Sequence, residues 1–175
     1  MEIEVKLRLP NKASHQKLAS SRAVLRLRFY EQTDIPKCFI CLKAKAVITN
    51  GVSRIEEDEE EVDPFIGYAC LEDPGKLMNV DSRVLGRVKE EFGANGFKGL
   101  GGFRTVKSVY EWNGVKLEVD EVKYEFGDLY EVECENVEPK KVKGMIETFF
   151  KENGIEYSES LMSKFTIFRA AKLPS

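Results

Sequence analysis

The sequence predicts an α+β fold in which antiparallel strands close into a β-barrel of about eight strands, with helices packed outside it. The first observation is alternation: charged residues recur at every second position at Glu2, Glu4 and Lys6, with apolar residues between them. The second is that this charged face is almost wholly ionic on several strands. The third is that acidic and basic pairs occur on different strands. A closed barrel with its ions inside accounts for all three, and an open sheet with one wetted face remains the alternative.

The first part of the chain is predicted to consist mainly of strands. Pro10 ends the opening strand, because proline lacks an N–H group for the sheet, and Asn11 can cap a short helix that reaches Ser21. Asn50-Gly51 is typical of a hairpin turn between two strands. The predicted strands cover residues 1–9, 23–30, 38–46 and 52–62.

Helices and a second group of strands are predicted after Asp63-Pro64. Asp81 can cap a helix that runs through Phe92, with Gly93 just beyond its end. Asn113-Gly114 is the strongest hairpin signal in the chain. Further strands are predicted over residues 105–112, 115–123 and 129–136, and further helices over residues 138–153 and 158–172.

Length and charge limit the class of protein. A chain of 175 residues, 42% of them hydrophobic, can bury one core, so we expect a single domain over residues 1–175. A net charge of −3 gives no overall field that would attract nucleic acid or an anionic membrane. No run approaches the roughly 18 apolar residues of a membrane span, and the acidic opening strand is unlike a secretory signal. We therefore expect a cytoplasmic monomer whose partners are small molecules.

The residue types favour a carboxylate metal site. A single histidine, His15, argues against most zinc sites and serine triads. Cys38 and Cys41 form a C-x-x-C, but they face opposite sides of a strand and no second pair completes a zinc site. Clustered carboxylates favour magnesium, manganese or calcium, whereas clustered lysine and arginine require an anion. A polyphosphate with bound metal would satisfy both.

The chain resembles the CYTH superfamily, the triphosphate tunnel metalloenzymes. Its amino-acid sequence is most similar to those of the plant single-domain members. The resemblance consists of short motifs that occur in the family's order along essentially the whole chain. They are E-x-E-x-K at residues 2–6, R-L-R at 26–28, L-K-A-K at 42–45, an approximate R-x-E-x-D-x-E at 54–60, V-D-E at 119–121, E-V-E-C-E at 131–135 and S-K-F at 163–165. One departure is that a strand which the family usually has before the R-L-R strand finds no match here. Either a segment is missing between Ser21 and Arg22 or the tunnel is one strand short, and the lack of turn residues at this junction favours a missing segment.

The resemblance implies roles for individual residues. Divalent metal, Mg²⁺ or Mn²⁺ at two sites, would be held by Glu2, Glu4, Glu57, Glu59, Glu133 and Glu135. Phosphate oxygens would be bound by Lys6, Arg26, Arg28, Lys43, Lys45, Lys107 and Lys164. The catalytic residues would be Glu2, Glu4, Lys6, Asp120 and Lys164. Simple cross-strand ion pairing remains an alternative for Arg28 and Lys45, as does snorkelling to solvent for Lys164.

The function that the resemblance implies is metal-dependent hydrolysis of the terminal phosphoryl group of a linear triphosphate. Inorganic tripolyphosphate is the leading substrate, because no aromatic cleft for a base is evident in the sequence. The alternatives are an adenylyl cyclase that converts ATP to cyclic AMP and pyrophosphate, or a thiamine or nucleoside triphosphatase. A polyphosphate-binding module without activity is a third class, which the complete set of acidic positions argues against.

Overall fold

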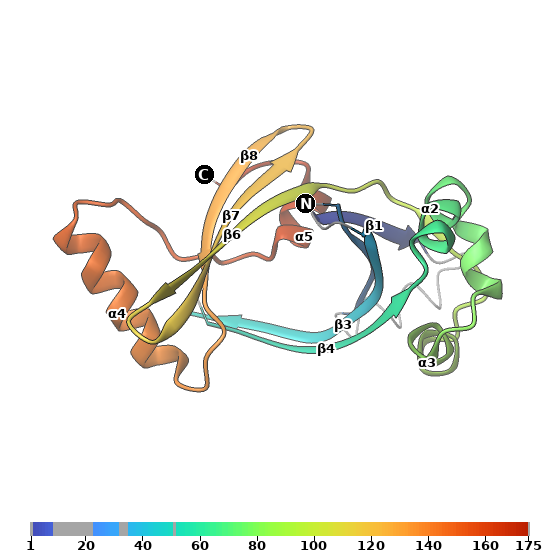
Figure 1. Ribbon diagram of the computed structural model, residues 1–175, viewed down its shortest axis with the longest axis horizontal. Helices are drawn as coiled ribbons and strands as arrows, with labels where there is room; N and C mark the ends of the chain where they lie inside the picture. Colours follow the sequence, from blue (N-terminus) through green and yellow to red (C-terminus); the bar gives the residue numbers. More distant parts are fainter. Residues whose placement is uncertain (1, 9–22, 32–34, 51, 175) are drawn as a thin grey trace. The chain divides into compact units, whose positions relative to one another are not determined.

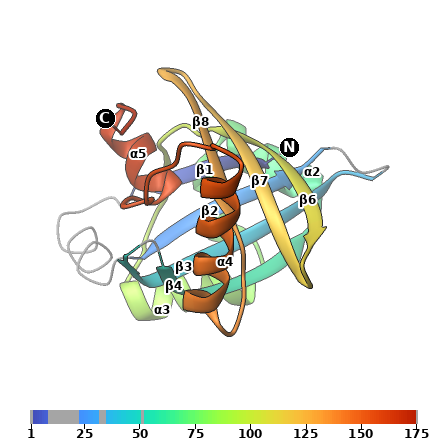
Figure 2. The ribbon, with the colours of Figure 1, turned by 90° about the vertical axis from the view of Figure 1, so that its left-hand side faces the viewer.

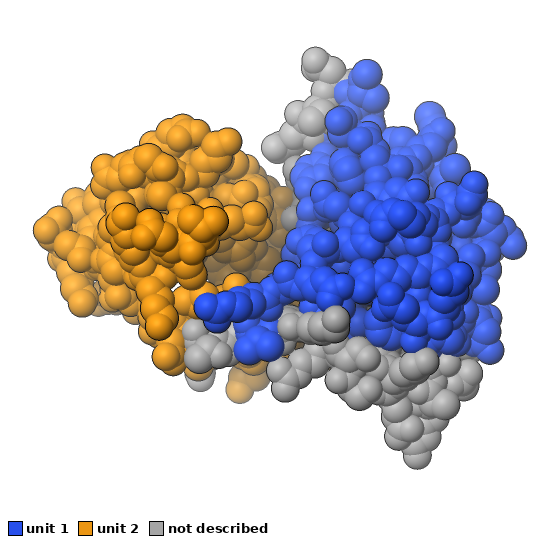
Figure 3. All heavy atoms as spheres, turned by 90° about the horizontal axis from the view of Figure 1, so that it is seen from below, with its two compact units in different colours: residues 1–47, 54–104 blue, residues 48–53, 105–175 orange. Residues whose placement is uncertain are grey.

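The computed structural model describes residues 2–8, 23–31, 35–50 and 52–174 (Figure 1). They form two compact units (Figure 3): unit 1 comprises residues 1–47 and 54–104, and unit 2 comprises residues 48–53 and 105–175. The predicted helix over residues 11–21 and the junction between Ser21 and Arg22 lie outside the described residues. The assignment of residues 1–175 to one domain stays a prediction.

Unit 1 is built on an antiparallel sheet with the strand order β4-β3-β2-β1. Its strands are β1 (Glu2–Arg8), β2 (Val24–Tyr30), β3 (Lys37–Thr49), β4 (Val52–Val62) and the short β5 (Lys98–Gly99), which pairs with β1. The tip of the β3–β4 hairpin, residues 48–53, belongs to unit 2. Asn50, in this predicted turn, has a positive φ of 51°, as a tight turn between two strands requires.

Three helical segments cover the apolar face of this sheet. They are α2 (Pro64–Glu72), the 3₁₀ helix η1 (Pro74–Asn79) and α3 (Arg83–Phe92). Leu27, Phe29 and Leu42 of the sheet and Val84 and Leu85 of α3 are all at most 1% exposed, and they pack in one cluster. Burying each such side chain stabilises the fold by roughly 1.5–3 kcal/mol.

Local sequence explains where α3 begins and ends. Its N-cap is Ser82, not the predicted Asp81, because the Ser82 hydroxyl accepts a hydrogen bond from the Leu85 backbone N–H at 3.2 Å. The predicted stop is confirmed, since Gly93 follows the helix with φ 64°, a conformation that glycine adopts without strain.

Unit 2 contains an antiparallel sheet with the order β6-β7-β8. The bounds are β6 (Arg104–Trp112), β7 (Val115–Tyr124), β8 (Gly127–Glu133), α4 (Pro139–Glu152) and α5 (Lys164–Ala170). Asn113 and Gly114 both have positive φ, 47° and 78°, which confirms the predicted hairpin. Figure 2 shows α4 and the three strands of this unit. Trp112 packs edge-on against Phe149 of α4, with ring centroids 5.3 Å apart. No described helix is long and apolar enough to cross a membrane.

The prediction of a closed barrel is wrong. Among the strands that the structure describes, β4 pairs only with β3 and β8 only with β7, so the hydrogen bonds do not complete a ring. Alternating charge fixes which face of a strand is polar. It does not fix the stagger between neighbouring strands, on which closure depends.

Candidate functional site

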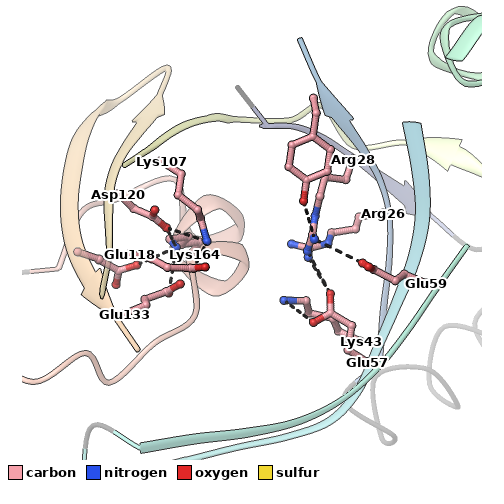
Figure 4. A network of polar contacts seen from close by, with 12 residues as sticks. Arg26, Arg28, Lys43, Glu57, Glu59, Lys107, Glu118, Asp120, Glu133 and Lys164 are labelled. Atoms are coloured by element: carbon pink, nitrogen blue, oxygen red, sulfur yellow. Dashed lines mark hydrogen bonds and ion pairs between the residues drawn. The ribbon is translucent and has the colours of Figure 1, made fainter. Parts of the chain in front are cut away.

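Two clusters of ion pairs lie on the polar faces of the sheets, one in each unit (Figure 4). We call the first the arginine cluster; it comprises Arg26, Arg28, Lys43, Glu57 and Glu59. We call the second the lysine cluster; it comprises Lys107, Glu118, Asp120, Glu131, Glu133 and Lys164.

In the arginine cluster, one carboxylate is shared by three cations. Arg26 Nη2 and Arg28 Nη2 donate to Glu57 Oε1 at 3.0 and 3.1 Å. The ammonium of Lys43 lies 3.3 Å from the other oxygen, Oε2. The arginine side chains are only 8% and 14% exposed, so solvent screens these contacts weakly. The five side chains of the cluster hold one more positive than negative charge, and their N–H groups are suited to an anion.

A second group of contacts surrounds Glu59 and the head of Arg28. Arg28 Nη1 lies 3.4 Å from Glu59 Oε2 and donates to the hydroxyl of Tyr30 at 3.1 Å. The thiol of Cys41 donates to Glu59 Oε2 at 3.6 Å. Burial raises the pKa of Cys41 to about 12, so its sulfur stays protonated and is a poor nucleophile.

The face of β4 that points away from the arginine cluster forms ion pairs with α3. Arg83 binds Asp58 with contacts of 2.7 and 2.9 Å, and these hydrogen bonds lower the pKa of the Asp58 carboxyl. Arg87 binds Asp58 and Glu56, with the shortest contact at 2.6 Å. The even-numbered acidic residues of the run are therefore paired with the helix, and the odd-numbered Glu57 and Glu59 belong to the arginine cluster.

In the lysine cluster, strand register places like charges opposite each other. Glu118 is opposite Glu133, and Asp120 is opposite Glu131, in the β7–β8 ladder. Such cross-strand pairs are destabilising unless a cation separates them. Lys164, at the first position of α5, lies 2.5 Å from Asp120 Oδ2, 2.9 Å from Glu133 Oε1 and 3.6 Å from Glu131 Oε2. A lysine is unfavourable at a helix start, so the carboxylates account for its position.

Burial strengthens these contacts. Asp120 is 1% exposed, and its Oδ1 atom has no hydrogen-bond partner among the described residues. Burial acts to lower the pKa of Lys164, but the charges of Glu133 and Asp120 outweigh it and raise the pKa. Burial raises the pKa of the Glu131 carboxyl, which accepts a hydrogen bond from Ser160 at 2.8 Å.

Lys107 is the second cation of the lysine cluster. It forms an ion pair with Glu118, and its ammonium lies 3.9 Å from Asp120 Oδ2. Two lysines therefore face four carboxylates, which leaves an excess of two negative charges. Excess negative charge and oxygen donors are what hard divalent cations prefer. Among the described residues, however, the potential ligand atoms that lie within 4.8 Å of one another belong to Cys41, Glu57 and Glu59.

Several predicted site residues are brought together. The arginine cluster contains the predicted Arg26, Arg28, Lys43, Glu57 and Glu59, and the lysine cluster contains the predicted Lys107, Asp120, Glu133 and Lys164. The alternative that Lys164 snorkels to solvent is excluded, because its ammonium lies among three carboxylates and its side chain is 18% exposed.

Other predicted residues lie elsewhere or are described only by their backbone. Glu135 lies beyond the end of β8 and is exposed, apart from the lysine cluster. The backbones of Glu2, Glu4 and Lys6 are paired with β2, opposite Tyr30, Arg28 and Arg26. The side chains of these β1 residues and of Lys45 lie outside what the structure describes.

Sequence reasoning did not select four residues that the structure adds, Tyr30, Cys41, Glu118 and Glu131. Alternation could have revealed two of them, because Glu118 has the same parity as Asp120, and Glu131 the same parity as Glu133. Tyr30 has the parity of Arg26 and Arg28, but an aromatic residue at a strand end gives no signal of its own.

Known proteins share this fold. The CYTH domain model matches residues 13–165. A Hippeastrum protein, described as a candidate adenylyl cyclase with a dominant triphosphatase activity, is 42% identical over 99% of this chain and 98% of its own, with a TM-score of 0.83. A candidate adenylate cyclase from Bacillus halodurans has a TM-score of 0.68 at 15% identity, over 95% of this chain and 81% of its own, and so shares the fold alone. The comparison with curated sequences gave no match. The family match over most of the chain and the 42% identity show that this chain belongs to the CYTH domain family.

Proposed function

We propose that this protein is a metal-dependent triphosphatase that removes the terminal phosphoryl group of a linear triphosphate, with inorganic tripolyphosphate as the leading substrate. The observation that supports it best is the gathering of Arg26, Arg28 and Lys43 around Glu57 on one polar face. The dominant triphosphatase activity named for the Hippeastrum protein favours the same reaction.

Phosphate binding by the arginine cluster is proposed to use its three basic residues. The guanidinium groups of Arg26 and Arg28 can each give two N–H bonds to phosphoryl oxygens, whereas Lys43 acts as a point charge. Both arginines now donate to Glu57, whose carboxylate offers the same acceptor geometry as a phosphate. An incoming anion would take over these N–H groups without any change in the strands.

We propose Mg²⁺ or Mn²⁺ as the cofactor, held by carboxylates. In the lysine cluster Glu133 and Glu131 are suited to this role, because the two lysines leave its carboxylates in excess. Glu57 and Glu59 are proposed ligands in the arginine cluster, and Glu2, Glu4 and Glu135 stay predicted ligands. When bound, such a cation supplies charge neutralisation at the phosphoryl oxygens.

The chain's own residues supply position and charge in this mechanism. Lys107 and Lys164 are proposed to donate to phosphoryl oxygens as negative charge develops on them. Asp120 holds the ammonium of Lys164 in place through its 2.5 Å contact. A covalent step through Cys41 is disfavoured, because its thiol is buried and protonated. Water is the proposed nucleophile: it attacks the terminal phosphorus in line with the bridging oxygen, that P–O bond breaks, and pyrophosphate leaves while the terminal group is released as phosphate.

A substrate panel tests this function. Tripolyphosphate, ATP, thiamine triphosphate and pyrophosphate should each be incubated with Mg²⁺ or Mn²⁺, with phosphate and cyclic AMP measured together. We expect phosphate release to be fastest from tripolyphosphate and to stop when the metal is chelated. More cyclic AMP than phosphate from ATP would instead support a cyclase, and tight binding without turnover would support a binding module.

A matched pair of variants links the activity to the site. Arg26→Ala should lower kcat/KM for tripolyphosphate by roughly 10- to 100-fold, as expected for the loss of charge-assisted hydrogen bonds. Arg169→Ala, which removes an exposed arginine of α5, should leave it unchanged. Equal activity of the two variants would contradict the proposed role of the arginine cluster.

A further inference from the structure

We infer that Tyr30 is a positioning residue for Arg28: its hydroxyl and ring hold the guanidinium group in the orientation that binds a phosphoryl oxygen. The inference rests on the proposed binding of a polyphosphate by the arginine cluster. It assigns a role to an uncharged residue that neither the motifs nor the alternation of charge selects.

Three contacts restrain the head of Arg28 through Tyr30. Arg28 Nη1 donates to the Tyr30 hydroxyl at 3.1 Å. The central carbon of the guanidinium lies 6.0 Å from the centroid of the Tyr30 ring, at the outer limit of a cation–π contact. The Tyr30 ring is itself fixed by Phe39, edge-on, with centroids 5.7 Å apart and an interplanar angle of 89°. Phe39 is opposite Arg28 in the β2–β3 ladder, so the strand register assembles all three residues.

The chemistry of the acceptor explains why this contact matters. Glu57 and Glu59 also accept from Arg28, but both are charged and compete with an anion for the same N–H groups. The hydroxyl of Tyr30 is neutral, so it can keep its hydrogen bond when a phosphate displaces a carboxylate. Arg28 then keeps its full positive charge and a fixed orientation, and it loses less rotamer freedom on binding.

Tyr30→Phe is the direct test, because it keeps the ring and removes only the hydroxyl. We expect the KM for tripolyphosphate, and its dissociation constant measured by calorimetry without metal, to rise roughly five-fold, with kcat changed much less. The matched control is Tyr130→Phe on β8, a residue that is 71% exposed. That variant should bind as the wild type does, and both variants should keep the wild-type Tm.

A double-mutant cycle separates positioning from a general structural role. If Tyr30 acts through Arg28, then Tyr30→Phe should weaken binding in the wild type but not in Arg28→Lys, since lysine lacks the planar fork that Tyr30 orients. The same loss in both backgrounds would overturn the inference. So would wild-type affinity in Tyr30→Phe.

The failures of this inference and of the proposed function are distinguishable. If the wild type hydrolyses tripolyphosphate and Tyr30→Phe changes neither KM nor affinity, only the inference fails. If the wild type binds tripolyphosphate without turnover, the proposed activity fails and the affinities alone decide the role of Tyr30. If it does not bind at all, both fail.

Discussion

Replacing Lys164 by methionine should destabilise the protein by about 3 kcal/mol near neutral pH, the usual cost of removing one partner from a buried ion pair. Methionine has a similar length and leaves no large cavity, so the effect isolates the charge. After the change, Asp120, Glu131 and Glu133 would face each other with Lys107 as the remaining cation of the lysine cluster. Its ammonium is 3.9 Å from Asp120, farther than the 2.5 Å of Lys164.

The size of this loss follows from the charges. At an effective dielectric constant of about 20, two unit charges about 4 Å apart interact by about 4 kcal/mol. Lys164 makes three such contacts, all within 3.6 Å, but it also loses hydration because its side chain is 18% exposed. The attraction and the desolvation oppose each other, so a net loss of about 3 kcal/mol is well below the sum of the contacts.

Urea unfolding followed by fluorescence measures the effect, because the single tryptophan, Trp112, lies in unit 2 and packs on α4. The midpoint should fall while the m-value stays constant. Lys140→Met, an exposed lysine of α4, is the matched control and should change little. Added Mg²⁺ should recover part of the loss in Lys164→Met, because the cation would neutralise the carboxylates that the lysine no longer reaches.

The pH dependence gives a second readout with a defined sign. The folded-state pKa of Lys164 is raised above 10.5, so its contribution is fully present below pH 10.5 and is lost as pH rises through the folded-state value. At the acid end Glu131, whose pKa burial raises, becomes protonated, so the difference between wild type and variant should shrink as the pH falls below about 4.5. A difference at about pH 3 that is as large as the one at about pH 8, or a difference that equals the Lys140→Met effect, would refute this account.

Two further predictions follow from other contacts. Glu131→Gln should raise the Tm near pH 7, because the raised pKa of Glu131 means that its ionisation opposes folding. The gain should vanish below about pH 4.5, and thermal unfolding at both pH values measures it. Gly67→Ala should destabilise unit 1 by about 2 kcal/mol in urea unfolding, because the added methyl would lie 2.5 Å from Cys38 Sγ and 2.9 Å from the Phe29 ring; wild-type stability in this variant would show that the core yields there.

The sequence predicted the structure well where the alternation of charged and apolar residues determines which face of a strand is buried. In β2, alternation assigned Arg26 and Arg28 to one face and Leu27 and Phe29 to the other, and the structure buries both apolar residues completely or nearly so. The Asn113-Gly114 hairpin was equally clear, because few residues other than glycine and asparagine adopt positive φ without strain. These features depend on neighbours along the chain.

Features that depend on pairing between distant segments were not predictable in this way. Parity places Glu118 and Glu133 on polar faces, but only the β7–β8 register makes them partners. Lys164 belongs to a helix, and only the family resemblance connected it with the acidic strands. The prediction of a closed barrel was wrong for the same reason, because the pattern of charged and apolar residues does not depend on the stagger between strands.

The ion pairs between α3 and β4 have a practical consequence for assays. Arg83 is 62% exposed at its contact with Asp58, whereas Arg26 is 8% exposed at its contact with Glu57. Dissolved ions shield the outer contact far more strongly than the inner one. Adding salt to weaken phosphate affinity would therefore also loosen the outer support of the strand that bears Glu57, so each kinetic salt series needs a melting curve recorded in the same buffers.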